Sequence, residues 1–161
     1  EYNARRQQCE AASLSLGASA LRDVSLRQFS GKFKTLDPVV ARRAKHVISE
    51  NDRTERAYQA LMNNDIPTMG KLMRESQTSM RDDFDITVEP IDYLSDLVNG
   101  LVGEQGGARM TGGGFGGCVV ALLPEHLLEE VSAEILARYK SPNGAVASIY
   151  SCEAAGGVCI I

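Results

Sequence analysis

A glycine-rich segment at residues 106–117, GGARMTGGGFGG, has the composition of a backbone loop that passes very close to a ligand or to another chain segment. Seven of its twelve residues are glycine, and each glycine adds backbone entropy that is lost on folding. Such a density indicates a conformation, or a close approach, that side chains would forbid. A tight hairpin or bulge without a ligand is the alternative, because glycine clusters also form simple turns.

The spacing of Gly112, Gly114 and Gly117 matches the G-x-G-x-x-G pattern of dinucleotide-binding loops. That pattern binds a dinucleotide only when a strand precedes the glycines and a helix follows them. Residues 118–123, CVVALL, instead have the apolar, β-branched composition of a short buried strand. No Lys-Ser or Lys-Thr pair follows the glycines, which excludes a Walker-type phosphate loop. The sequence therefore predicts a loop between two strands.

The histidines and an aspartate cluster are the other groups that could do chemistry. His46 and His126 have no Ser, Cys or paired carboxylate at helical spacing, so a structural or exposed position is favoured for both. Asp82, Asp83 and Asp85 are close enough in sequence to hold a divalent cation. Aspartates followed by an extended run, here ITV, are more typical of a helix end. Neither group predicts a catalytic residue or a metal site.

Length and composition predict one globular domain. The chain has 161 residues, 43% of them hydrophobic, and a net charge of -4 without a basic stripe, so nucleic acid is excluded as a partner. No apolar run has the length of a membrane span, and a soluble, cytoplasmic protein is expected. The four cysteines form no C-x-x-C pair, which favours reduced thiols over a zinc site.

The first hundred residues have the periodicity of amphipathic helices. Helices are predicted over 3–16 before Gly17, over 25–33, after the N-cap Asp37, after Asp65, and from Glu89-Pro90. The charged side chains of the long helix after Asp37 are predicted to form a solvated face. The inward stripe of this helix is predicted to comprise Val40, Ala44, Val47, Ile48, Tyr58, Leu61 and Met62. The next helix has a methionine-rich stripe that is expected to pack in the core, with Met69, Leu72, Met73 and Met80.

Strand patterns begin beyond Gly100. The order is a short strand, the glycine loop, the strand at 118–123, a helix opened by Pro124, the turn SPNG at 141–144, and a final half-buried strand at 145–152. The inward residues of the helix after Pro124 are predicted to be Leu127, Leu128, Val131, Ile135 and Leu136. Helices followed by this unit predict an α+β sandwich, with helices packed on a largely antiparallel sheet.

Four segments resemble galactokinases, members of the superfamily of galactose, homoserine, mevalonate and phosphomevalonate kinases. GGARMTGGGFGGCVVAL at 106–122 is similar to their glycine-rich third motif. EYNARRQQCE at 1–10, LRDVS at 21–25 and ESQTSMRDDFDITVEPID at 75–92 resemble further galactokinase segments in the same order. The resemblance covers nearly the whole chain but departs at the tail, where galactokinases usually have Pro-Ser-x-Gly-Ala and this chain has CEAAGGVCII at 152–161.

The resemblance implies that residues 1–161 form a ferredoxin-like C-terminal kinase lobe. In galactokinases the sugar motif, the Ser-rich phosphate loop and the catalytic Asp lie in the N-terminal lobe, which is absent from this chain. No catalytic residue and no metal ligand are therefore assigned here. The complete enzyme is expected to bind ATP, Mg²⁺ and D-galactose and to make galactose 1-phosphate, whereas the fragment is expected to bind no cofactor tightly and to be inactive alone.

Two elements of the site follow from the same resemblance. Tyr2 matches the tyrosine of the Glu-Tyr-x-x-Arg-Arg segment, whose side chain lies at the galactose pocket. The loop that faces the cleft comprises Gly112, Gly113, Gly114, Phe115, Gly116 and Gly117. Two alternatives remain for the parent protein, a non-catalytic galactokinase-like sugar sensor and a related kinase such as an N-acetylgalactosamine or mevalonate kinase.

Overall fold

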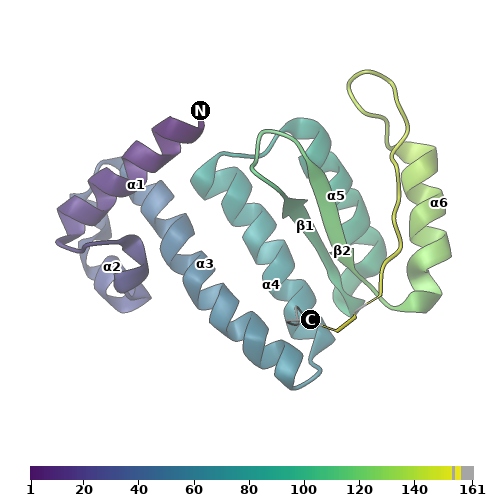
Figure 1. Cartoon of the computed structure of the whole chain (residues 1–161), viewed down its shortest axis with the longest axis horizontal. Coiled ribbons are helices and arrows are strands. Elements are labelled where there is room, and N and C mark those ends of the chain that lie inside the picture. The colour runs from purple at the N-terminus through teal and green to yellow at the C-terminus, as the bar shows by residue number, and fades with distance from the viewer. Residues whose placement is uncertain (154, 157–161) are drawn as a thin grey trace, which may run out of the picture.

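The computed structural model describes residues 1–153 and 155–156. Figure 1 shows helices α1, α2 and α3 on one side, a β-hairpin with α5 and α6 on the other, and α4 between them. The elements are α1 (Tyr2–Leu16), α2 (Leu26–Lys32), α3 (Pro38–Met62), α4 (Ile66–Ser79), α5 (Glu89–Val102), β1 (Gly107–Thr111), β2 (Cys118–Leu122) and α6 (Leu128–Arg138). The two strands are antiparallel, with Ala108 opposite Ala121, and the α+β class predicted from the sequence is confirmed.

Local capping explains where several helices begin and end. Asp37 accepts hydrogen bonds from the backbone N–H groups of Val39 and Val40 at 2.9 and 3.1 Å, and so begins α3. Asp65 begins α4 in the same way. Gly17 ends α1 in the left-handed region with a φ of 70°. These three predicted boundaries are confirmed.

The hydrophobic core is divided between the two sides of the molecule. On one side, Ala12, Phe29, Ala44 and Ile48 are buried where α1 and α2 pack against α3. On the other side, the buried cluster joins α5, β1 and α6 and contains Val98, Val102, Ala108, Val131 and Ile135. Helix α4 lies between the two clusters, so the hairpin is positioned through its contact with α4 and α5.

Side-chain amides complete the hydrogen bonding of β1 away from β2. Asn99 of α5 accepts the N–H of Ala108 at 2.7 Å and donates to its carbonyl at 3.0 Å. Gln77 of α4 accepts the N–H of Met110 at 2.7 Å. The edge of β1 is therefore covered by two helices instead of a third strand, which satisfies backbone groups that burial would otherwise leave unpaired.

The predicted last strand at 145–152 is wrong. The SPNG turn forms, with the N–H of Gly144 donating to Ser141 at 2.8 Å, but residues 145–152 have no strand structure. Val146 and Tyr150 are 62% and 84% exposed, and the side chain that reaches the α5–α6 core is the small Ala147. Alternation of apolar residues fixes a strand only where one face is buried, and here the burial is slight. Residues 154 and 157–161 of the divergent tail lie outside the described residues.

Two predictions about helix faces are also wrong. Tyr58, Leu61 and Met62 at the end of α3 are more than half exposed, and Leu136 of α6 is 48% exposed. Helix α3 has 25 residues against 15 in α1, so its last turns run past the helix that covers its first half. Periodicity identifies a stripe but does not reveal which element covers it. In the described residues no helix is both long and apolar enough to cross a membrane.

Candidate functional site

The glycine loop is a hairpin connection with an unusual backbone. Residues 112–117 join β1 to β2, as predicted, and φ is positive at Gly112, Gly114, Phe115, Gly116 and Gly117. At Gly114, where φ is 85°, an added Cβ would also lie 3.0 Å from the Ile86 carbonyl oxygen. Glycine is therefore required at this position by both backbone conformation and space. The helix that a dinucleotide-binding loop needs is replaced by β2.

The loop is fixed to two other parts of the chain. The N–H of Phe115 donates to the Ile86 carbonyl oxygen at 2.6 Å. The Arg5 guanidinium carbon lies 5.9 Å from the centroid of the Phe115 ring, within the range of a cation–π contact. These contacts join the loop to the segment after α4 and to the first turns of α1.

Tyr2 lies at the beginning of α1 and is 74% exposed. Arg5, one helical turn later, is buried against the loop residue Phe115. The start of the chain and the glycine loop consequently lie at the same end of the molecule (Figure 1). The structure brings the two predicted site elements to one region, and their role toward a sugar stays a prediction.

Two buried arginines near this end were missed by sequence reasoning. Arg5 donates to the carbonyl oxygens of Phe84 and Asp85, both at 2.7 Å, and to the Asp85 carboxylate at 3.0 Å. Arg43 of α3 donates to the Asp83 carbonyl at 2.7 Å and to the same Asp85 carboxylate at 3.1 Å. Arg43 is 4% exposed, so its predicted position on a solvated face is wrong. Burial, followed by the neighbouring Arg5 charge, lowers the pKa of Arg43.

His46 belongs to a buried hydrogen-bond chain, which confirms its predicted structural role. Its Nδ1 atom lies 3.0 Å from the Ser79 hydroxyl, which donates to the Asp83 carboxylate at 3.0 Å. Lys45 donates to the other Asp83 oxygen at 2.9 Å, and the His46 ring stacks on Phe84. Because Ser79 is only 3% exposed, its hydroxyl does not reach a substrate. The other histidine, His126, is exposed, also as predicted.

The aspartate cluster ends a helical segment, as its favoured interpretation predicted. Residues Met80–Phe84 form a π-helical turn, and Asp85 ends it in the left-handed region with a φ of 56°. Asp83 and Asp85 are bonded to lysine and arginine side chains, and Asp82 to Arg81. Within residues 1–153 and 155–156, no group of three or more His, Cys, Asp or Glu side chains is placed to hold a metal ion.

Comparison with known proteins identifies the family. Residues 57–141, more than half of the chain, match the family model described as GHMP kinases C terminal. The chain belongs to this family. The match begins within α3 and ends after α6, so it includes the π-helical turn and the glycine loop of this GHMP kinase chain.

A solved structure extends the likeness of the GHMP kinase chain toward its first residues. The crystal structure of Lactococcus lactis galactokinase complexed with galactose matches 92% of this chain with a TM-score of 0.85 and 29% sequence identity. The match covers 39% of the Lactococcus protein, so the chain spans about two fifths of the length of that enzyme. These findings support the galactokinase-type C-terminal lobe expected from the sequence.

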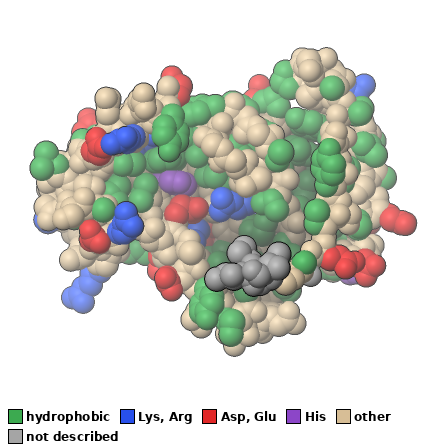
Figure 2. Space-filling view, in the orientation of Figure 1, with side chains coloured by type: hydrophobic (Ala, Val, Ile, Leu, Met, Phe, Trp, Pro, Cys, Tyr) green, Lys and Arg blue, Asp and Glu red, His purple; other side chains and the backbone are tan. Residues whose placement is uncertain are grey.

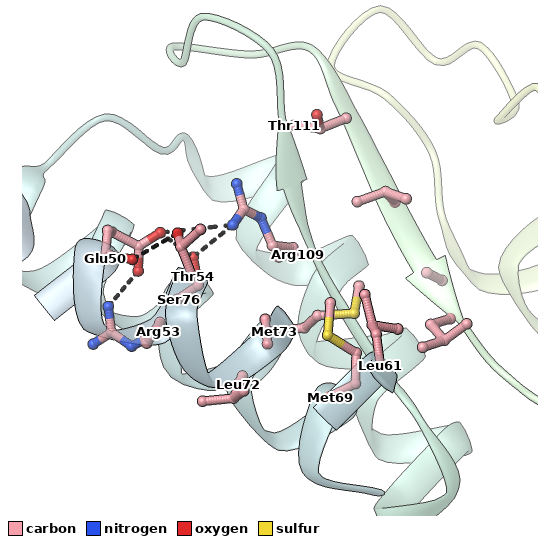
Figure 3. Close-up of a pocket in the computed structure, with 14 residues that line it drawn as sticks. Glu50, Arg53, Thr54, Leu61, Met69, Leu72, Met73, Ser76, Arg109 and Thr111 are labelled. Carbon is pink, nitrogen blue, oxygen red and sulfur yellow. Dashed lines mark hydrogen bonds and ion pairs between the residues drawn. The ribbon is translucent and has the colours of Figure 1, made fainter. Parts of the chain in front are cut away.

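A cavity of about 480 Å³ lies between α3, α4 and the hairpin of the GHMP kinase chain (Figure 3). At one end Ser76 donates to Glu50 at 2.7 Å and accepts from Arg109 at 2.9 Å, while Arg53 pairs with Glu50. The opposite end is apolar and includes Met69, and Thr111, immediately before the glycine loop, also lines the cavity. Figure 2 shows acidic and basic side chains gathered on this face, flanked by hydrophobic ones. The charged groups are bonded to one another, so the cavity presents no free cation or anion among its lining residues.

The methionine-rich stripe contributes to packing in this GHMP kinase chain, as predicted for most of its residues. Leu72, Met73 and Met80 are each at most 5% exposed, and Met69 lines the cavity. The thiols of Cys9, Cys118 and Cys152 are free. Cys159 lies outside the described residues.

Gly114→Ala is expected to destabilise the hairpin, whereas Gly113→Ala is not. Alanine at a positive φ costs about 1–2 kcal/mol, and at position 114 its Cβ also presses on Ile86. Gly113 has no positive φ, and no atom of the described residues lies within 4 Å of an added Cβ, so its replacement should change the free energy of unfolding by less than about 0.5 kcal/mol. Urea unfolding of both variants measures the difference. Equal midpoints would contradict both the left-handed backbone at Gly114 and its close approach to Ile86.

Proposed function

We propose that this chain is the C-terminal lobe of a galactokinase, which transfers the γ-phosphoryl group of ATP to the anomeric hydroxyl of D-galactose. The products are galactose 1-phosphate and ADP, and the enzyme acts in the cytoplasm. The observation that carries the proposal is the likeness, over 92% of the chain, to a galactokinase whose structure was solved with galactose. The position of the start of α1 and of the glycine loop at the same end of the lobe, where Arg5 faces Phe115, supports it further.

In this proposal the lobe forms one wall of the sugar site. Tyr2 offers an exposed ring and a hydroxyl that can both donate and accept hydrogen bonds. The loop from Gly112 to Gly117 offers main chain without bulky side chains, except at Phe115, which Arg5 and Ile86 hold in place. Catalysis of phosphoryl transfer depends largely on positioning and on electrostatic stabilisation of the transferred group. The contribution of this lobe is therefore to place the sugar hydroxyl.

ATP and Mg²⁺ are the ligands proposed for the complete enzyme. The acidic side chains near the loop do not fit a metal site, because Asp83 and Asp85 are already bonded to Lys45, Arg5 and Arg43. We therefore assign no Mg²⁺ ligand to the described residues of this lobe, and we place the phosphate-binding and metal-binding groups in an N-terminal lobe that completes the enzyme.

The proposal predicts different activities for the isolated chain and for the complete enzyme. Residues 1–161 should release no ADP that depends on galactose, because a lobe without phosphate loop, metal ligands and base lacks the groups that stabilise the transferred phosphoryl. A protein that also contains the N-terminal lobe should release ADP with galactose and give galactose 1-phosphate. A coupled spectrophotometric assay with ATP, Mg²⁺ and galactose measures both.

The same assay separates the alternatives. N-acetylgalactosamine and mevalonate serve as competing substrates, and a preference for either would assign the chain to another kinase of the family. Galactose binding without ADP release by the complete protein would instead indicate a sugar sensor. Galactose-dependent ADP release by residues 1–161 alone would contradict the assignment of catalysis to the other lobe.

A further inference from the structure

The π-helical turn before the glycine loop is held from two directions by buried arginines. The last carbonyl groups of a helix have no partner within it, and positive groups bind well at this end. Here the carbonyls of residues 83, 84 and 85 are all bonded to guanidinium groups, the first to Arg43 and the other two to Arg5. Helices α1 and α3 thereby hold one turn that lies about 80 residues from Arg5 and about 40 residues from Arg43 in the sequence.

The Asp85 carboxylate joins the two arginines. Its Oδ2 atom lies 3.0 Å from Arg5 and 3.1 Å from Arg43, so one negative charge lies between two positive ones. Gln8 also accepts from the Nε atom of Arg43 at 3.2 Å, which ties α1 to α3 at the same place. Without the carboxylate, two buried cations would remain next to each other with less compensation. The Asp85 side chain, although 67% exposed, is therefore the acidic group that bridges both arginines, in addition to their bonds to backbone carbonyls.

This cluster lies one residue before the point at which the glycine loop is fixed. Ile86 follows Asp85 directly and accepts the N–H of Phe115, while Arg5 also faces the Phe115 ring. The cluster thus contacts the glycine loop through Arg5, and the same Arg5 lies one helical turn from Tyr2.

We propose that Arg5, Arg43 and Asp85 are positioning residues that hold the start of α1 and the glycine loop in fixed relation to each other. The three residues form a clamp, in which the arginines fix the turn at 83–85 and the next residue, Ile86, bonds Phe115. The clamp does not touch the sugar; it acts through Tyr2 and the loop. This inference rests on the proposed function for its effect on galactose, but its effect on the loop stands on the contacts alone.

The first test measures the loop directly. Asp85→Asn keeps the shape of the side chain and tolerates the left-handed backbone, but removes the charge shared by the arginines. We expect the amide of Phe115 in the 161-residue chain to exchange with solvent about tenfold faster, because hydrogen bonds to charged groups are among the stronger ones. The control is Asp82→Asn, which also removes one carboxylate from this turn. Asp82 pairs with Arg81 at 2.9 Å and not with the arginines of the clamp. Unchanged exchange at Phe115 in Asp85→Asn would overturn the proposal.

A second variant keeps the test decisive if Asp85→Asn does not fold. Arg5→Lys retains the charge but cannot bond the Phe84 carbonyl, the Asp85 carbonyl and the carboxylate together, since an ammonium lacks the planar fork of a guanidinium. We expect faster exchange at Phe115 in this variant too. Arg6→Lys, on the solvent side of the same helix, is its control, because Arg6 pairs with Glu10 on the surface. Equal exchange in Arg5→Lys and Arg6→Lys would overturn the proposal.

The third test uses the complete enzyme and separates positioning from general stability. Asp85→Asn should raise the KM for galactose about tenfold while leaving the KM for ATP unchanged, since the clamp orients the sugar side of the site. Asp82→Asn should alter neither constant. If the wild-type enzyme is active and Asp85→Asn has the same KM for galactose, the proposal of a clamp is overturned. A complete wild-type protein that does not phosphorylate galactose would instead overturn the proposed function. The exchange measurement at Phe115 would then still show whether the clamp holds the loop.

Discussion

Gly70→Ala is expected to lower the free energy of unfolding of this chain by about 3 kcal/mol, because α4 and β1 touch through their backbones at this residue. A Cβ at Gly70 would lie 2.0 Å from the Gly106 carbonyl oxygen and 2.8 Å from the Gly106 Cα. Both atoms belong to the backbone and cannot rotate away. The strand would have to move off the helix and lose the bond between Gln77 and Met110.

Gly100→Ala is the matched control. Gly100 also lies in a helix, α5, but an added Cβ there would have no neighbour within 4 Å in the part of the chain that the structure describes. Alanine is the better helix former, so this change should raise the free energy of unfolding by about 0.5–1 kcal/mol. Urea unfolding followed by circular dichroism gives both values. A Gly70→Ala protein as stable as the wild type would show that the backbones of α4 and β1 do not touch at this residue.

The packing at Gly70 also determines where the glycine loop lies. Strand β1 begins at Gly107, against α4, and leads after five residues into Gly112. A strand displaced from α4 would carry the loop away from Ile86, with which Phe115 is hydrogen-bonded. The glycines of this region therefore do two different things. Gly70 and Gly107 permit contact between two elements, and Gly114 permits the backbone turn.

Features that depend on nearby residues could be predicted from the sequence. The caps at Asp37 and Asp65 need only a side-chain oxygen and the N–H groups two or three residues later. The hairpin was predictable because an apolar, β-branched run follows the glycines directly, which excludes a helix there. The resemblance to galactokinases then connected Tyr2 with the loop, although more than a hundred residues separate them in the sequence.

Features that depend on distant partners could not be predicted. The residues next to Arg43 in the sequence do not distinguish it from a surface arginine. Its buried position depends on bonds to the Asp83 carbonyl and the Asp85 carboxylate, about 40 residues away. The same holds for Glu50 and Arg109, because these two side chains pair with each other and both bond Ser76. The prediction of a strand over 145–152 was wrong for the opposite reason. Its alternating pattern was present, but its side chains gain little burial in the described structure.

His46 is expected to make the protein less stable as the pH falls below 6.5. Burial is the main cause that lowers the pKa of His46 to about 4 in the folded chain. The charges of Arg53 and Arg109 lower this pKa further, whereas those of Glu50 and Asp83 oppose the shift. Because Ser79 donates its proton to Asp83, the neutral His46 ring donates its Nδ1–H to Ser79. Protonation would add a second N–H and a charge in a buried place.

The direction of the effect follows from proton binding in the two states. Between pH 6.5 and 4 the unfolded chain binds a proton at His46 that the folded chain does not, so stability is complete above pH 6.5 and falls as the pH decreases toward 4. One pKa unit corresponds to 1.36 kcal/mol, which gives a loss of about 2 kcal/mol at pH 5 and about 3 kcal/mol at pH 4. His46→Asn is the matched variant, since an amide can still bond Ser79 but does not titrate in this range. Urea unfolding at pH 7.5 and pH 5 should show a larger loss in the wild type than in His46→Asn by about 2 kcal/mol, because carboxylate titration is common to both. Parallel losses in the two proteins would mean that burial does not hold His46 neutral in the folded chain between pH 7.5 and pH 5.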